Sequence, residues 1–302
     1  MKKELAEYFA SHTLEKNKEH VKKIIDEIDA EGKISYIDLF NLTVAPIRLL
    51  TFPQHKGSME NMRRLDEFIA LSIYFYIYCD FDYVLIVQGL EGIGKSTFSL
   101  KIIEKLKRLG LNFDMTKDMI TKNWEYEDVI EKLDTCRNTV IYFDEGKKFF
   151  DLRRSMYPER IDMLEYFTTE RWRKNVYIIS ASDLNEIDKY FRERRAKAIC
   201  LNMDRGLVAF LHSKNLFGVG TDRFYLDKFE RDIDALKKID FERQCAMLME
   251  LPSCFGVGFY EKMKDGIWND YMKFKTAHFG KNPKDPINSK LLKYLQNENL
   301  SK

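Results

Sequence analysis

A glycine-rich stretch, residues 89–96, carries the residue types and spacing that fit one chemistry most closely. It reads Gly-Leu-Glu-Gly-Ile-Gly-Lys-Ser and meets every fixed position of the pattern G-x-x-x-x-G-K-[ST], whose backbone N–H groups surround phosphate oxygens. Lys95 is expected to contact the β- and γ-phosphates, and Ser96 to hold Mg²⁺. The pattern therefore predicts a binding site for ATP. The residues expected to form it are Gly89, Leu90, Glu91, Gly92, Ile93, Gly94, Lys95, Ser96 and Thr97.

An apolar run that ends in two carboxylates gives the second chemical signal. Residues 139–145 read Thr-Val-Ile-Tyr-Phe-Asp-Glu and lie downstream of the glycine-rich loop. This is the Walker B arrangement, in which Asp144 would support Mg²⁺ and Glu145 would polarise an attacking water. Because the two carboxylates are adjacent, the pattern favours hydrolysis over transfer to a bound hydroxyl group.

A third apolar run, residues 176–183, ends in small polar side chains. Ser180 or Ser182 is a candidate sensor of the γ-phosphate, at the end of an additional strand. Alternatively, Ser182 or Asp183 caps a helix that begins at Leu184. The two interpretations are compatible, since one segment can do both.

Arginines form the last group of candidate residues. No guanidinium lies inside the glycine-rich loop, so charge that develops during hydrolysis lacks an obvious partner there. We therefore expect an arginine of a neighbouring subunit to act in trans, while most arginines of this group, to which Arg171 and Arg173 also belong, form surface ion pairs with interleaved acidic residues. The candidates for the trans role are Arg153, Arg154, Arg192, Arg194 and Arg195.

The elements that must position these residues follow from the hydrophobic pattern. Downstream of residue 80, apolar runs alternate with helical periodicity, which is typical of a parallel sheet with crossover helices. Residues 98–109 are expected to form the helix that follows the loop. The expected strands are 83–87, around 111–115, 139–143, 176–181, 197–202 and 207–212.

Three regions separate by pattern. Residues 1–80 are expected to be a helical N-terminal region, residues 81–226 the P-loop ATPase core, and residues 227–302 a helical C-terminal region with turns at Pro252, Gly256 and Gly258. Within the first region, residues 27–38 resemble a calcium-binding loop, although Glu and Asp replace the preferred first and last ligands. A helix that ends at a glycine turn is the favoured interpretation there.

Composition narrows the class of protein. The 302 residues are 45% apolar, and 50 basic against 48 acidic residues leave a formal charge of +2, so bulk charge does not argue for a polyanionic partner. The charged start lacks the apolar segment of a signal peptide, and no apolar stretch is long enough to span a bilayer. We therefore expect a soluble, cytoplasmic protein, located in the host cytoplasm if the protein is viral. The cysteines, expected to be reduced core residues, are Cys79, Cys136, Cys200, Cys245 and Cys254.

Beyond the loop, the chain resembles viral and plasmid ATPases related to the zonula occludens toxin domain and, more distantly, HerA–FtsK DNA pumps. The resemblance covers residues 80–230 and rests on the segments 144–156, 171–179 and 184–192. It implies a RecA-like sheet with an additional strand, a ring-shaped homo-oligomer, and movement of DNA or assembly of particles driven by ATP. Those pumps usually carry Gln or Asn as the sensor, and this chain has Ser-Ala-Ser at 180–182.

Two other functions remain open at this stage. The loop is also similar to that of thymidylate kinases, but those enzymes begin near the loop and no Asp-Arg pair follows it here in the expected place. An ATP-driven switch or loader that acts on protein partners is the second alternative. The sequence predicts an α/β fold, a RecA-like and mainly parallel sheet flanked by helices with helical additions at both ends. The favoured function is an oligomeric ATP-hydrolysing motor with a DNA, capsid or replication-protein partner.

Overall fold

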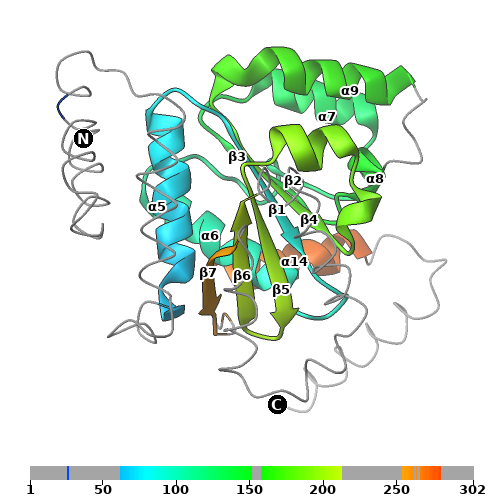
Figure 1. The fold of residues 1–302 in the computed structure, drawn as a ribbon. Coiled ribbons are helices and arrows are strands. Elements are labelled where there is room, and N and C mark those ends of the chain that lie inside the picture. The colour runs from blue at the N-terminus through cyan, green and yellow to red at the C-terminus, as the bar shows by residue number, and fades with distance from the viewer. Residues whose placement is uncertain are drawn as a thin grey trace.

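A seven-stranded sheet with helices on both faces organises the described part of the chain (Figure 1). The computed structural model describes Asp26 and residues 62–151, 158–212, 254–261, 263 and 266–279. Its elements are, in chain order, α5 (Leu65–Tyr78), β1 (Tyr83–Gln88), α6 (Lys95–Arg108), β2 (Met119–Ile120), α7 (Tyr126–Thr135), β3 (Val140–Phe143), α8 (Lys147–Phe150), α9 (Pro158–Thr169), η3 (Glu170–Arg173), β4 (Val176–Ala181), η4 (Leu184–Glu186), η5 (Tyr190–Arg195), β5 (Ala198–Asp204), β6 (Leu207–His212), β7 (Cys254–Phe259) and α14 (Ile267–Phe279).

The strands lie in the order β2-β3-β4-β1-β5-β6-β7. The first five of these are parallel, whereas β6 and β7 run antiparallel to their neighbours. Strand β4 lies between β1 and β3, so an additional strand separates the strand before the loop from the strand before the two carboxylates. The order confirms the predicted RecA-like, mainly parallel sheet.

Each face of the sheet covers one hydrophobic core. Along β1, Leu85 packs with residues of α5, α6 and α14, whereas Ile86 packs with residues of α7, α8 and α9. In Figure 1, α5 lies at the left of the sheet, whereas α7 and α9 lie together at its upper right. All six residues of β1 are buried, which explains its unbroken apolar run, since a strand covered on both faces has no reason to alternate with polar residues.

The strand predictions are largely confirmed, but the second is wrong. The expected strand around 111–115 is replaced by an isolated bridge from Asn112 to Thr139, and β2 forms later, at Met119–Ile120. A turn interrupts the segment, because the Asp114 side chain accepts hydrogen bonds from the backbone N–H and the hydroxyl of Thr116. The helix after the loop also begins at Lys95, earlier than predicted.

The segment expected to be helical near the C-terminus contributes a strand. Gly256 and Gly258 lie within β7, so the predicted turns at these residues are wrong. A Cβ atom on Gly258 would lie 2.4 Å from the Met62 carbonyl oxygen and 2.5 Å from Leu65 Cβ. Glycine is therefore required there, because the start of α5 packs directly on β7.

Some predictions lie partly or wholly outside the described residues. They include the calcium-like loop at 27–38, the turn at Pro252, and most of the two outer regions, so the three-part division remains a prediction. Four cysteines are buried, as expected for core residues: Cys79, Cys136, Cys200 and Cys254. Within the described ranges, no helix combines the length and apolar character needed to cross a membrane.

Candidate phosphate-binding site

The glycine-rich loop lies at the carboxyl end of β1 and runs into the first turn of α6. Gly92 and Gly94 have φ values of 75° and 109°, which L-residues with side chains rarely adopt. Lys95 folds back over the loop, and its Nζ donates hydrogen bonds to the carbonyl oxygens of Gly89 at 2.6 Å and Leu90 at 2.9 Å. Burial lowers the pKa of Lys95, and the Glu91 carboxylate opposes this effect. The ammonium group thus lies against backbone carbonyl oxygens of the loop, whose sequence matches the phosphate-binding pattern.

Residues from the antiparallel half of the sheet and from β5 beside it support this loop. The Tyr260 hydroxyl lies 2.8 Å from Asn202 Oδ1 and 3.1 Å from the Gly94 carbonyl oxygen. A Cβ atom on Gly94 would come within 2.5 Å of that hydroxyl oxygen. Arg205 Nε also donates to the Gly92 carbonyl oxygen, at 3.2 Å. Sequence reasoning missed all three supporting residues, which come from β5, from the turn after it and from the end of β7.

Asp144 ends β3 and lies beneath the loop, with 5% of its surface exposed. Its Oδ1 accepts hydrogen bonds from Ser96 Oγ at 3.1 Å and from the Tyr142 hydroxyl at 2.9 Å. Tyr142 is fully buried, and burial together with the Asp144 charge raises the pKa of its hydroxyl well above the usual value. Tyr142 therefore stays a hydrogen-bond donor and fixes one carboxylate oxygen next to Ser96.

The second carboxylate oxygen of Asp144 faces α14. Oδ2 accepts a hydrogen bond from the Tyr271 hydroxyl at 3.2 Å, and Lys275 Nζ lies 2.9 Å from it. Burial, followed by the Asp144 charge, raises the pKa of Tyr271 to about 12. Neither side chain was predicted, because no local motif marks a tyrosine and a lysine one helical turn apart as part of a distant site.

Glu145 holds an unusual backbone conformation. Its φ is 65°, in the left-handed region, although it is not a glycine. The next residue, Gly146, donates its N–H to the Ser180 carbonyl oxygen at 2.8 Å, and a Cβ atom there would lie 2.5 Å from Ile179 Cγ2. This turn holds the Glu145 carboxylate outward, half-exposed and 3.9 Å from Lys122 Nζ. Such strain, of about 1–3 kcal/mol, is concentrated at functional sites in proteins.

These residues surround one cleft of about 720 Å³. Its lining includes Lys95, Ser96, Asp144 and Glu145, which the sequence had predicted to act together, and also Lys275. Their predicted roles in binding and catalysis stay predictions, since the geometry shows proximity alone. The full lining is Glu91, Gly92, Lys95, Ser96, Lys122, Asp144, Glu145, Lys147, Lys148, Asp151, Ser180, Ala181, Ser182, Glu186 and Lys275.

The two sensor candidates differ in position. Ser180 is buried, and its hydroxyl lies 3.1 Å from the Tyr142 hydroxyl, behind Asp144. Ser182 is exposed and lines the cleft. The capping alternative is confirmed for Asp183, whose side chain accepts a hydrogen bond from the Asn185 N–H at the start of η4. Both serines contribute to the lining of the cleft, but only Ser182 is exposed, so Ser182 remains the better sensor candidate.

The donor set in the cleft fits Mg²⁺. Ser96 and Asp144 offer a hydroxyl and a carboxylate oxygen, the hard ligands that Mg²⁺ prefers, and Mg²⁺ commonly completes its shell with water and substrate phosphates. No cluster of three or more His, Cys, Asp or Glu residues suitable for a metal occurs in the part of the chain that the structure describes.

The structure divides the arginine candidates. Arg195 is buried in an ion pair with Asp82, at the amino end of β1 and opposite the loop, so the predicted trans role of Arg195 is wrong. Arg192 is also buried, and its guanidinium donates to the Leu184 carbonyl oxygen and to Asn185 Oδ1. A residue that reaches into a neighbouring subunit must be exposed, and this excludes Arg192 in the described arrangement. Arg194 is exposed, whereas Arg153 and Arg154 lie outside the described residues.

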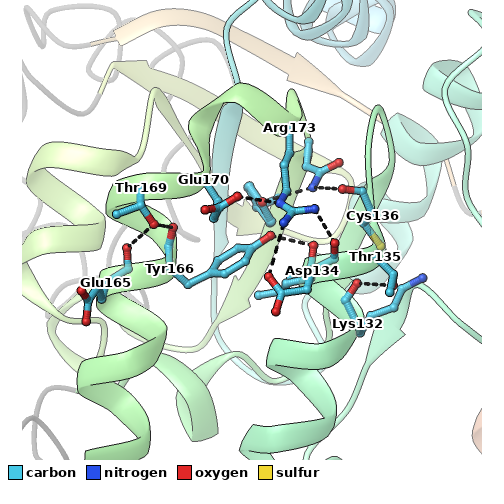
Figure 2. Close-up of polar contacts among 12 residues, drawn as sticks. Lys132, Asp134, Thr135, Cys136, Glu165, Tyr166, Thr169, Glu170 and Arg173 are labelled. Atoms are coloured by element: carbon cyan, nitrogen blue, oxygen red, sulfur yellow. Dashed lines mark hydrogen bonds and ion pairs between the residues drawn. The ribbon is translucent and has the colours of Figure 1, made fainter.

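Arg173 behaves as the sequence predicts. Figure 2 shows its guanidinium between Glu170 and Asp134, with Tyr166 beside it. Arg173 Nε donates to Glu170 Oε2 at 2.8 Å, and a second nitrogen lies 3.4 Å from Asp134 Oδ1. Arg173 thus forms the expected ion pairs at the amino end of β4, although its side chain is largely buried and not on the open surface.

Comparisons with known proteins give distant relatives. No family model matches the chain. Over 133 residues, 42% of this chain and 77% of the relative, the chain is 27% identical to the nucleoside-triphosphatase THEP1 of Methanocaldococcus jannaschii. The genome packaging NTPase B204 of Sulfolobus turreted icosahedral virus 2, solved with ATP-gammaS, is 14% identical over 44% of this chain and 93% of its own, with a TM-score of 0.33. The N-terminal domain of zonular occludens toxin from Neisseria meningitidis is 13% identical over 43% of this chain and 83% of its own, with a TM-score of 0.28.

The described core has the RecA-like α/β fold of P-loop domains, with an additional strand in its sheet. The loop follows β1, the paired carboxylates follow β3, and β4 lies between these strands. The sequence match to a nucleoside-triphosphatase agrees with this classification.

Replacement of Arg195 by Met should destabilise the fold. The change leaves the Asp82 charge buried without its partner, which typically costs about 3–5 kcal/mol. The free energy of unfolding, measured in urea, should fall by that amount, and the added change Asp82→Asn should restore part of it. A singly substituted protein of parental stability that fails only in catalysis would return Arg195 to the list of catalytic candidates.

Proposed function

We propose that this chain is an ATP-hydrolysing motor that works as a homo-oligomeric ring on DNA, in translocation or packaging for a virus or mobile element. One observation carries the enzymatic part of the proposal. A single cleft at the carboxyl ends of β1, β3 and β4 brings together Lys95, Ser96, Asp144 and Glu145. In parallel α/β sheets, ligands bind at the carboxyl ends of the strands.

The side chains of the cleft fit distinct tasks in ATP hydrolysis. The loop N–H groups and Lys95 would neutralise and orient the β- and γ-phosphates. Ser96 and Asp144 would hold Mg²⁺, which when bound neutralises further phosphate charge. Glu145, held outward by its strained backbone, would orient a water molecule and accept its proton. Hydrolysis then needs no acceptor site beyond the cleft.

Several observations support hydrolysis over transfer to a nucleotide. The relative matched at 27% identity is named a nucleoside-triphosphatase. The additional strand β4 is the feature implied by the resemblance to DNA pumps and related ATPases. The DNA partner and the ring rest on that resemblance, and the trans arginine would be Arg153, Arg154 or Arg194.

Lys95→Ala should abolish tight binding of ATP. The ammonium group is the fixed positive charge of the loop, and its loss should weaken the affinity by about 100-fold, because an unmatched buried charge costs several kcal/mol. Titration with a fluorescent ATP analogue measures the change. Lys107→Ala, at the exposed far end of α6, is the matched control and should bind normally. Unchanged affinity in Lys95→Ala would exclude this loop as the phosphate site.

Glu145→Gln should leave ATP bound but slow its hydrolysis by about 100- to 1,000-fold, because the amide keeps the shape and loses the proton acceptor. Single-turnover phosphate release measures the rate. The control variant Glu170→Gln changes a residue near the amino end of β4, away from the cleft, and should hydrolyse ATP at the parental rate. If Glu145→Gln also retains the parental rate, the proton acceptor is a different group.

The motor proposal is tested by DNA stimulation together with solution mass. With Mg²⁺ and ATP, the steady-state rate of phosphate release per subunit should rise with protein concentration and with added double-stranded DNA, while the solution mass shows a ring. Hydrolysis without stimulation would instead support a switch that acts on protein partners. Phosphoryl transfer to added nucleoside monophosphates would contradict the motor and support the kinase.

A further inference from the structure

Helix α14 brings a second lysine into the proposed ATP site. Tyr271 and Lys275 are one helical turn apart, so both point from the same face of α14 toward the end of β3. They contact the same oxygen, Asp144 Oδ2, at 3.2 and 2.9 Å. Lys275 also lines the cleft that contains Lys95. Helix α14, which is far from the loop in sequence, thus supplies a cation to the cleft.

Lys275 contacts Asp144, the carboxylate that is proposed to hold Mg²⁺. Asp144 accepts two hydrogen bonds at Oδ1, from Ser96 and Tyr142. Lys275 lies at its other oxygen, Oδ2. A divalent cation held by Ser96 and Asp144 would lie close to the Lys275 ammonium. Because two cations repel at such short range, Lys275 must leave Asp144 when the metal arrives with ATP.

The cleft offers Lys275 a different anion. Its side chain is 28% exposed and ends a flexible four-carbon stem, so the ammonium is able to turn into the cleft. Two other lysines of the lining already pair with carboxylates outside the proposed metal site, Lys147 with Glu186 and Lys148 with Glu125. A triphosphate held by Lys95 would place a strong anion in the same cleft as Lys275.

We propose that Lys275 is a further catalytic residue, which moves from Asp144 to the γ-phosphate when ATP and Mg²⁺ bind. This rests on the proposed ATP hydrolysis. In that reaction, the water oxygen forms a bond to the γ-phosphorus, the bond from this phosphorus to the bridging oxygen of ADP breaks, and the water proton passes to Glu145. Lys275 keeps its own protons throughout. It stabilises the negative charge on the phosphoryl oxygens in cis, the task for which the sequence suggested only an arginine in trans.

The contact predicts a loss of discrimination between ATP and ADP. Only ATP carries the γ-phosphate, so Lys275→Met should weaken binding of a non-hydrolysable ATP analogue by about tenfold and leave the affinity for ADP unchanged, both with Mg²⁺ present. Competition against a fluorescent nucleotide measures both affinities. The single-turnover rate of phosphate release should fall by about 100-fold, as for loss of one transition-state donor.

Two further variants sharpen the comparison. Lys275→Arg keeps the positive charge and should recover a large part of both the affinity and the rate. Lys273→Met removes an exposed lysine two residues away on α14 and should match the parent in every measurement. Thermal unfolding of all variants separates a loss of fold from a loss of function.

Two results would overturn the proposal. If Lys275→Met binds the ATP analogue more tightly and hydrolyses ATP at or above the parental rate, Lys275 only competes with the metal for Asp144. If folded Lys275→Met keeps the parental preference for the analogue over ADP, Lys275 does not touch the γ-phosphate. Failure of the proposed function looks different, because the parental protein would then release no phosphate from ATP at all.

Discussion

The site depends on the hydrogen bonds and the ion pair that the buried Asp144 carboxylate forms. A carboxylate removed from water is costly unless every oxygen finds a partner, and here the two oxygens have four partners from three elements. Ser96 comes from the first turn of α6, Tyr142 from β3 itself, and Tyr271 and Lys275 from α14. The charge therefore fixes the start of α6 and the face of α14 relative to the end of β3. The loop, Asp144 and α14 therefore form one connected unit.

The sheet order gives this unit its dimensions. Because β4 lies between β1 and β3, the carboxyl ends of these two strands are separated by two strand spacings, about 10 Å. The carboxyl end of β4 faces that space with Ser182, while Ser180 supports Tyr142 from behind. The turn at Glu145 and Gly146 packs against β4, so the same strand both spaces the site and holds the outward glutamate.

Local patterns explain how much the sequence could predict. The loop, β1, β3 and β4 were readable because each is a continuous apolar run followed at once by its chemical residues. Strand β2 was misplaced because two paired residues follow a turn at Asp114, and no periodicity arises over such a length. The antiparallel strand β7 was missed, since its two glycines have the composition of a turn and are required by the packing of α5.

Residues that reach the site from afar could not be found from sequence. Tyr260, Tyr271 and Lys275 act through contacts with residues more than a hundred positions earlier, and nothing near them in sequence marks that role. At Arg195 the sequence instead predicted a catalytic role that the structure does not support. Arg195 belongs to an arginine-rich segment, but it forms a buried ion pair with Asp82. The structure instead shows a cation in the same cleft that the sequence did not mark, Lys275.

A crystal structure of the full chain with Mg²⁺ and a non-hydrolysable ATP analogue tests this account most directly. The account predicts the γ-phosphate against the ammonium groups of Lys95 and Lys275, with Mg²⁺ between Ser96, Asp144 and the phosphates. A nucleotide bound outside the cleft, or a fully loaded cleft in which Lys275 still lies on Asp144, would contradict it.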